Sequence, residues 1–328
     1  MHVVESDRYL GDQLSKNLSE SVYETVKKRV ALANQSVYEI RAVVDDARAD
    51  ALGRLTVGFT IWETSIISML LANSEVWTEI GKKTIKMLDR LQLKYLRLVT
   101  GVGTGCPIPI LLYHTGTLSM TNRIMLRKIM FCFHVATLPP STLAREVYDT
   151  MVQHNHVGLW REVEPVLRDL NLGPLESYSK YQFRKIVKLK IHQKQKHELL
   201  KMAEKYKKIN PDLLSQDEFR VQDYFKTLTV TQSRLRFRPF AQMMPRVATC
   251  WKGVRMYRER EYQCLAHREA GEPITEENRD TYDHILTCKY YAEMRSDLSL
   301  STHEGIVTYF QWVIADRAEL EKYLDENE

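Results

Sequence analysis

Apolar side chains recur every three or four residues over much of this chain, which is the spacing of an amphipathic helix. Residues 19–44 keep this pattern over the longest distance, and Ser19 and Ser21 are good N-terminal caps for such a helix. Glycine and proline interrupt the pattern at 101–107, 139–140 and 173–174. The same spacing predicts further helices over residues 59–71, 82–98, 120–137, 141–153, 159–171, 176–208, 215–228 and 304–324. We therefore expect a mainly α fold.

Two segments depart from the helical pattern. Residues 9–12 are a short apolar stretch followed by a turn signal, and we expect them to form one arm of a hairpin. The other arm either lies at Val3 and Val4 or is missing. Residues 234–260 are rich in basic residues and show no period, so they are expected to be irregular.

Length and composition point to an ordinary globular protein. The 328 residues suggest two or three domains, and 44% are hydrophobic and 27% charged. Five scattered cysteines argue against a disulfide framework and for a reducing compartment. No signal peptide pattern is present at the N-terminus, and no apolar run reaches the ~18 residues of a membrane span. We expect an intracellular protein of the nucleus or cytoplasm that does not enter the membrane.

Basic charge is concentrated in two segments. The net charge is +5, yet residues 176–208 hold 11 Lys and Arg against 3 Glu, and residues 234–260 hold 8 against 1. A polyanionic partner, RNA or DNA, is the natural inference, although a solvated helix face gives the same pattern. The candidate nucleic-acid-binding residues are Lys180, Arg184, Lys185, Lys188, Lys194, Lys201, Arg234, Arg236, Arg238 and Arg246. Tyr178, Tyr181, Phe237, Trp251 and Tyr257 are candidates for stacking on unpaired bases, and the alternative is that most of them are core residues.

Two pairs of soft ligands lie near the C-terminus. Cys264-Leu-Ala-His267 is followed after 16 residues by His284-Ile-Leu-Thr-Cys288. A two-residue gap lets a tight turn aim the first pair at one point, and a three-residue gap places the second pair one helical turn apart. Thiolates and imidazoles suit a structural zinc ion, so we expect one zinc per chain at these four residues. The alternative is chance packing of small buried cysteines. Cys250 and His303 are close enough in sequence to act as substitute ligands.

No set of residues amounts to a complete active site. The glycine-rich stretch 101–106 lacks the Gly-Lys-Ser/Thr of a phosphate loop and follows a helical pattern, which favours an interhelix loop. Asp45 and Asp46 are adjacent in a helical pattern, so their carboxylates point about 100° apart and do not converge on a metal. We identify no catalytic residues and no cofactor-binding residues.

Four groups of short motifs follow one another in a particular order. They are Arg8-Tyr-Leu-Gly-Asp12; Thr25-Val-Lys-Lys-Arg29 leading to Tyr38-Glu-Ile40; Ile61-Trp-Glu63 with Met69-Leu-Leu-Ala-Asn-Ser-Glu-Val-Trp77 and Leu88-Asp-Arg-Leu-Gln92; and Asp283-His-Ile-Leu-Thr-Cys288. In this order the chain resembles the C-terminal half of the reverse transcriptase of non-LTR (LINE-like) retrotransposons. The likeness covers most of the chain and is weakest over residues 140–230.

The resemblance implies a helical thumb-like bundle, a long basic helix and a small C-terminal zinc-knuckle module. The corresponding domains are a palm and primer-grip remnant at 1–18, a thumb-like domain at 19–138, a helical linker with the basic helix at 139–233, a basic segment with the zinc knuckle at 234–303, and a C-terminal helix at 304–328. The family usually has cysteine as its second knuckle ligand, where this chain has His267.

The resemblance also implies a function. The aspartate pair that carries polymerase chemistry in the family would lie upstream of Tyr9, so we expect this chain alone to be inactive as an RNA-directed DNA polymerase. The expected function is binding of a template-primer or of element RNA by a truncated retroelement protein. The alternatives are a helical protein-interaction scaffold with a structural zinc, and a fragment whose palm belongs to a longer parent chain.

Overall fold

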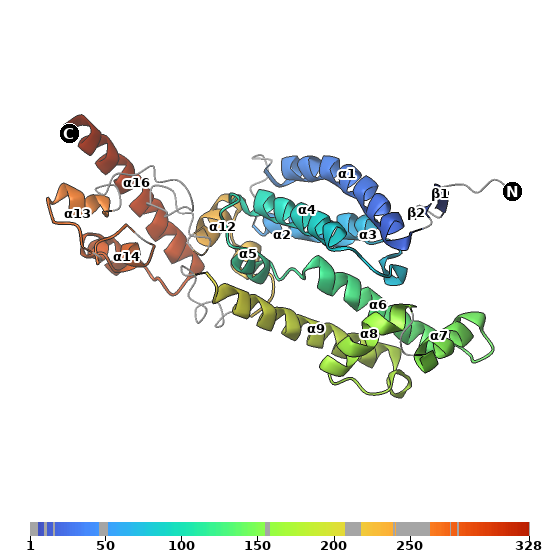
Figure 1. The fold of residues 1–328 in the computed structure, drawn as a ribbon. Helices are drawn as coiled ribbons and strands as arrows, with labels where there is room; N and C mark the ends of the chain where they lie inside the picture. Colours follow the sequence, from blue (N-terminus) through green and yellow to red (C-terminus); the bar gives the residue numbers. More distant parts are fainter. Residues whose placement is uncertain are drawn as a thin grey trace. The chain divides into compact units, whose positions relative to one another are not determined.

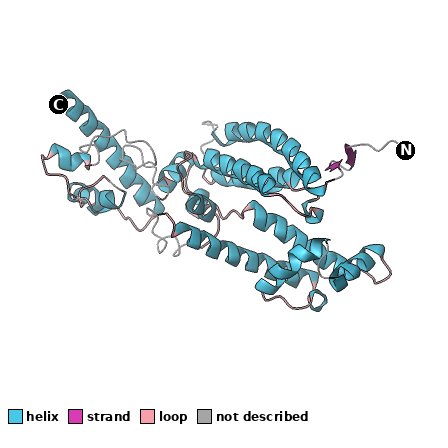
Figure 2. Ribbon diagram, viewed as in Figure 1, coloured by secondary structure: helices cyan, strands magenta, loops and turns pink. Residues whose placement is uncertain are grey.

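The structure is a computed structural model. It describes residues 6–9, 12–15, 17–45, 52–154, 158–206, 218–238, 240, 263–275, 277–280 and 282–327. Across these residues the regular structure is helical, apart from one two-stranded hairpin and two isolated bridges (Figure 2). The expected mainly α fold is confirmed.

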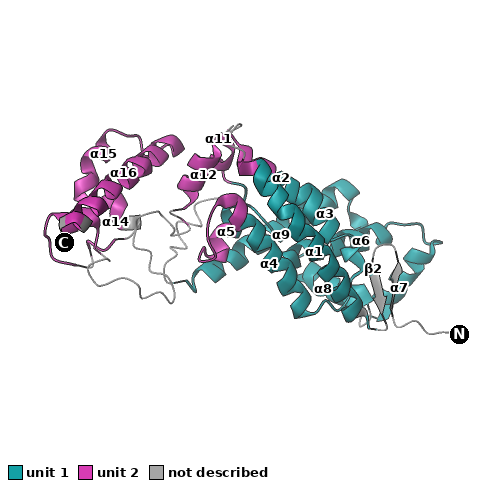
Figure 3. Cartoon of the chain, turned by 90° about the horizontal axis from the view of Figure 1, so that it is seen from above, with its two compact units in different colours: residues 1–43, 58–96, 112–221 teal, residues 44–57, 97–111, 222–328 magenta. Residues whose placement is uncertain are grey.

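The chain forms two compact units (Figure 3). Unit 1 comprises residues 1–43, 58–96 and 112–221, and unit 2 comprises residues 44–57, 97–111 and 222–328. The elements up to residue 206 are β1 Ser6–Tyr9, β2 Asp12–Ser15, α1 Leu18–Asp45, α2 Arg54–Ile61, α3 Ile67–Leu70, α4 Lys82–Thr100, α5 Ile108–His114, α6 Met120–Ala136, α7 Leu143–His154, α8 Gly158–Asp169 and α9 Lys180–Ala203 (Figure 1). The later helices are α11 Tyr224–Thr227, α12 Val230–Phe237, α13 Leu265–Glu269, α14 Tyr282–Thr287, α15 Ala292–Ser296 and α16 His303–Asn327.

The hairpin differs from the one expected. Strands β1 and β2 are antiparallel, and Tyr9 is paired with Asp12. Tyr9 and Asp12 therefore belong to opposite arms, and the expectation of one arm over residues 9–12 is wrong.

The first helices of unit 1 bury one face each. Val26, Ala33 and Val37 of α1 are fully buried, as the periodic pattern predicted. Between α2 and α3 the chain makes a π-helical turn, Trp62–Ile66, whose Trp62 ring stacks on Tyr95 of α4 with centroids 4.5 Å apart. The Tyr95 hydroxyl donates to the carbonyl of Gly58 at 2.6 Å, so this buried polar group is satisfied.

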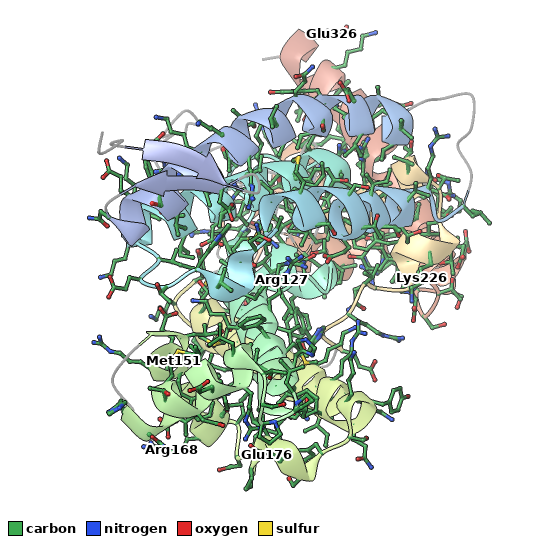
Figure 4. The ribbon with its side chains drawn as sticks, turned by 90° about the vertical axis from the view of Figure 1, so that its right-hand side faces the viewer. Arg127, Met151, Arg168, Glu176, Lys226 and Glu326 are labelled. Atoms are coloured by element: carbon green, nitrogen blue, oxygen red, sulfur yellow. The ribbon has the colours of Figure 1, made fainter. Side chains whose placement is uncertain are left out.

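Helices α6 to α9 form a second apolar cluster within unit 1. At its centre the rings of Phe133 and Phe183 stack with centroids 4.3 Å apart, and both are buried. Arg168 and Glu176 lie at the outer edge of this part of the chain (Figure 4). Ser179 begins α9 with a capping box, because its side chain accepts from the backbone of Gln182 and the Gln182 side chain accepts from the backbone of Ser179.

Three local expectations are corrected. Helix α5 was not expected, because nearly all of its residues are buried and no amphipathic period marks it. Of the described residues in the helix expected at 215–228, only Tyr224–Thr227 are helical, and Val221 instead bridges Thr115. The expected irregular segment begins inside a helix, because α12 extends to Phe237. The remainder of 234–260, apart from Arg238 and Phe240, lies outside the described residues.

Candidate functional site

Three of the four predicted metal ligands converge in unit 2. Cys264 immediately precedes α13, His284 lies in α14, and Cys288 follows α14 directly. One ligand atom from each of these residues lies within 4.8 Å of the others, and both cysteines are buried. The backbone amide of Cys288 donates to the carbonyl of His284 at 2.6 Å, which continues the helical turn and holds the two side chains on the same side. Two sulfurs and an imidazole are a donor set for a soft divalent cation.

The three side chains are hydrogen-bonded to one another. A hydrogen bond between the two thiols raises the pKa of Cys264 to about 12 and lowers the pKa of Cys288 to about 7. A hydrogen bond to Cys264 also raises the pKa of His284. Hydrogen bonds within the group are the largest cause of all three shifts, and burial is the second. A divalent cation at this position would displace the protons of these hydrogen bonds.

His267 approaches the same point from α13. It is not part of the 4.8 Å group, but its ring centroid is 5.0 Å from that of His284. Its Nδ1 is 2.8 Å from a carboxylate oxygen of Glu272. Its Nε2 is buried and has no hydrogen-bond partner among the described residues. Metal-binding histidines commonly bond a carboxylate through the nitrogen that does not face the metal, so this arrangement fits a fourth ligand.

Glu272 is itself held in place. Lys289 lies 2.6 Å from its carboxylate, and the Tyr290 hydroxyl donates to the same group. These contacts, with the Lys289 contact the largest, lower the pKa of Glu272 to about 2. The carboxylate therefore remains charged at neutral pH and orients the imidazole of His267.

A buried ion pair joins the ligand region to α16. Arg317 and Asp280 are 2.6 Å apart, and their side chains are 1% and 3% exposed. Arg317 also places Nη1 3.9 Å from the sulfur of Cys264. Helix α16 thus contributes a positive charge beside a metal-binding thiol. Sequence reasoning missed this pair, and nothing in the spacing of the two residues signals it.

The predicted basic residues of α9 lie mainly on its exposed side. Buried positions recur every fourth residue along the helix, at Phe183, Val187, Ile191, Gln195, Leu199 and Ala203. Lys180, Arg184, Lys185, Lys188 and Lys201 are exposed, and none of them forms an ion pair with another described residue. We call these five residues the α9 basic face. The Lys194 side chain is only 32% exposed and forms an ion pair with Asp169 at 3.9 Å, so its charge is partly neutralised.

The basic residues of the second segment have different surroundings. Arg234 pairs with Asp45 at 2.7 Å and donates to the carbonyl of Val99 near the end of α4, so it closes contacts inside unit 2. Arg236 lies over the rings of Tyr224 and Phe240, at 5.5 and 4.7 Å. Burial lowers the pKa of Arg238. Arg246 and the substitute ligand Cys250 lie outside the described residues.

The candidate stacking residues also differ in how exposed they are. Tyr181 is 76% exposed, whereas Phe237 is fully buried and packs 5.8 Å from Phe225. Phe237 is therefore closed to a nucleobase, and of the two alternatives it is a core residue. Tyr178 packs against the α6–α9 cluster, and its hydroxyl accepts from the amide of Gly173. Trp251 and Tyr257 lie outside the described residues.

Other candidate chemistry resolves into packing. Cys106 and Cys132 are buried, and burial raises the pKa of each thiol to about 12. His303 packs edge-on against Tyr224 at 5.6 Å. Across the part of the chain that the structure describes, Cys264, His284 and Cys288 are the one group of three or more His, Cys, Asp or Glu placed to hold a metal ion.

Comparison with known proteins adds no family. No protein-family model, no curated protein and no solved structure matches this chain. A search of the described helices finds none that is both long and apolar enough to cross a membrane.

Proposed function

We propose that this chain binds single-stranded nucleic acid through the α9 basic face and carries a zinc-stabilised module at its C-terminal end. The observation that carries the proposal is the set of exposed cations on α9, which lie outside its row of buried residues and lack ion-pair partners among the described residues. Glu198 is the only acidic residue in this helix. The resemblance to non-LTR reverse transcriptases supports the same function, as a thumb, linker and zinc knuckle that hold a template-primer or element RNA.

The proposed contact is with phosphates. From Lys180 to Lys201 the basic face extends for about 30 Å at 1.5 Å per residue. Such a row follows a phosphate backbone without reading base edges, so binding is weakly selective for sequence. Each phosphate contact releases counterions. On single strands the logarithm of the binding constant therefore falls with the logarithm of the salt concentration, with a slope of about −0.7 per contact.

The proposed metal is one zinc ion held by Cys264, His267, His284 and Cys288. Two sulfurs and two imidazoles complete a tetrahedral set, and the orphaned Nε2 of His267 supports the fourth position. Four protein ligands leave no open position for a substrate, so the role is structural. Metal analysis of the purified protein tests this assignment, and full zinc occupancy in a Cys288→Ala variant contradicts it.

The binding test reverses four charges of the basic face: Lys180→Glu, Arg184→Glu, Lys185→Glu and Lys188→Glu. A matched control reverses four exposed charges elsewhere: Arg161→Glu, Arg168→Glu, Lys226→Glu and Lys322→Glu. Binding of a labelled oligouridine is measured over a salt series, with circular dichroism to verify folding. We expect the first variant to lose most of its affinity and to show a flatter salt slope than the control. Equal behaviour of the two folded variants contradicts the proposal.

A helical protein-interaction scaffold is the second candidate. Leu143 and Val147 lie one turn apart on α7 and are 75% and 49% exposed, which favours an apolar contact with another protein. The scaffold function gains if the four-charge α9 variant binds oligouridine as the native chain does.

A further inference from the structure

A groove runs between α1 and α4, which lie side by side in unit 1 (Figure 1). It has a volume of about 460 Å³. Lys83, Lys86, Arg90 and Lys94 of α4 line it, together with Tyr23 and Asn34 of α1. No acidic side chain lines it.

The four cations form a single row. Their spacings of three, four and four residues place them on one face of α4, within about 80° of arc at 100° per residue. Lys83, Lys86 and Arg90 are exposed, and Lys94 is half-buried. None of the four forms an ion pair with another described residue.

A row of like charges opposes helix formation. Each like-charged neighbour at this spacing costs about 0.2–0.5 kcal/mol on an isolated helix. In α1 and α7, by contrast, opposite charges pair within the helix, as in Lys27–Glu24 and Arg145–Asp149. An uncompensated row that lines a concave surface is the arrangement expected of a site for a polyanion.

Two tyrosines of α1 accompany the row. The Lys83 ammonium lies 4.4 Å from the centre of the Tyr23 ring, and Lys94 lies 4.7 Å from that of Tyr38. Lys94 also donates to Asn34 at 2.8 Å, which fixes its position at the wall of the groove. Tyr38 is 57% exposed, so its ring remains open to a further stacking partner. Cations in a groove with an exposed aromatic ring beside them are typical of single-strand binding surfaces.

We infer that the groove between α1 and α4 binds the backbone of single-stranded nucleic acid, with Tyr38 stacking on a base. The row spans about 16 Å from Lys83 to Lys94, which is the rise of about five stacked nucleotides. The inference rests on the proposed function and adds a second contact surface to it.

The test neutralises three exposed members of the row, Lys83→Gln, Lys86→Gln and Arg90→Gln. Glutamine is a good helix former, so α4 is preserved. Each exposed charge contact is worth a factor of about two to five, so we expect oligouridine affinity to fall about tenfold or more. The salt slope should decrease in magnitude by about two, at about 0.7 per lost contact. The control removes the same charge at Arg161→Gln, Arg168→Gln and Lys322→Gln, and circular dichroism verifies the helix content of each variant.

The outcomes separate this inference from the proposed function. If the α4 variant binds like its control while the α9 variant is weakened, the groove is overturned and the proposed function stands. If the α4 variant is weakened while the α9 variant is not, the groove holds and the α9 basic face is overturned. If both folded variants bind as their controls do, both proposals fail.

A second variant identifies the ligand as nucleic acid. We expect Tyr38→Leu to weaken oligouridine binding about fivefold or more, because a base loses its stacking partner. The same variant should bind inorganic polyphosphate, which has no bases, as the native chain does. Unchanged oligouridine binding by the Tyr38→Leu variant overturns the stacking contact and reduces the groove to a general polyanion site.

Discussion

The α6–α9 cluster of unit 1 differs from the metal module of unit 2 in what it buries. The metal module is the described residues from 263 to 327. In the cluster, helices of 17 and 24 residues, α6 and α9, pack aromatic and aliphatic faces together. In the metal module, α13 and α14 have 5 and 6 residues. Helices that short are not stable by themselves.

The buried groups of the two regions differ accordingly. The cluster has Phe133 on Phe183 at its centre. The module buries Cys264, His267 and the Asp280–Arg317 ion pair beside apolar side chains such as Ile285 and Phe310. Apolar burial holds the first region together at any metal concentration. The second combines apolar burial with polar links that a metal would complete, so metal removal should affect the second region and leave the first unchanged.

The largest expected effect is that of metal removal. The apparent free energy of zinc binding at structural sites is about 10–16 kcal/mol at neutral pH. This exceeds the folding free energy that helices as short as α13 and α14 can contribute without the metal. We expect a zinc chelator to expose the amides of α13 and α14 to hydrogen exchange while α6 and α9 stay protected. Mass spectrometry of exchanged peptides measures both regions in one sample. Unchanged protection of α13 and α14 after complete chelation contradicts a structural metal.

The next effect is in the apolar cluster. Phe183→Ala removes one ring of the central stack and should lower the free energy of unfolding by about 3–5 kcal/mol. The loss should be the same with and without chelator, because Phe183 lies in unit 1. Urea titration followed by circular dichroism measures it. Tyr181→Ala, two residues away and 76% exposed, is the matched control and should change stability by less than about 0.5 kcal/mol.

A smaller effect, on zinc affinity, is expected at Glu272, whose carboxylate contacts His267. Glu272→Gln keeps the shape of the side chain but removes the charge that orients the imidazole, and zinc affinity should fall about tenfold or more. Competition with a chromophoric chelator at fixed pH measures the affinity. Glu269→Gln, an exposed position on α13, should leave it unchanged. Equal affinities of the two variants would show that Glu272 does not support the site.

The smallest effect is at the start of α9. Ser179→Ala deletes the capping box and should lower the free energy of unfolding by about 1 kcal/mol. Ser179→Asp keeps an acceptor at the cap and should restore most of it. Neither change should alter zinc affinity, since the cap and the metal module belong to different units. A change in zinc affinity would mean that the two regions are coupled.

The long helices could be predicted from the sequence because each buries one face. In α1, Val26, Ala33 and Val37 follow the helical period and are all buried. Helix α5 could not be found in this way, since burial on nearly all sides leaves no polar face to set a period. The helix expected at 215–228 was wrong because Val221 pairs with Thr115, a residue more than a hundred positions away, and tertiary pairing overrode local propensity.

The candidate site was predictable only in part. Spacing alone identified Cys264, His284 and Cys288, since two short gaps place the ligands on adjacent turns. Glu272 carries no signal of its own among the many acidic residues of the chain. Arg317 and Asp280 are 37 positions apart, and only the packing of α16 brings them together. The row on α4 has a period that sequence reasoning could have found, but its concave setting beside Tyr23 depends on how α1 packs.

The position of Arg317 has a consequence for synthesis on the ribosome. Among the described residues it is the last buried one, and it follows Cys288 by 317 − 288 = 29 positions. All four proposed ligands therefore leave the exit tunnel before the guanidinium that neutralises Asp280. A nascent chain can capture its metal first and dock α16 afterwards. A chain that ended between these two positions would hold all four proposed ligands and would leave Asp280 without its counter-charge.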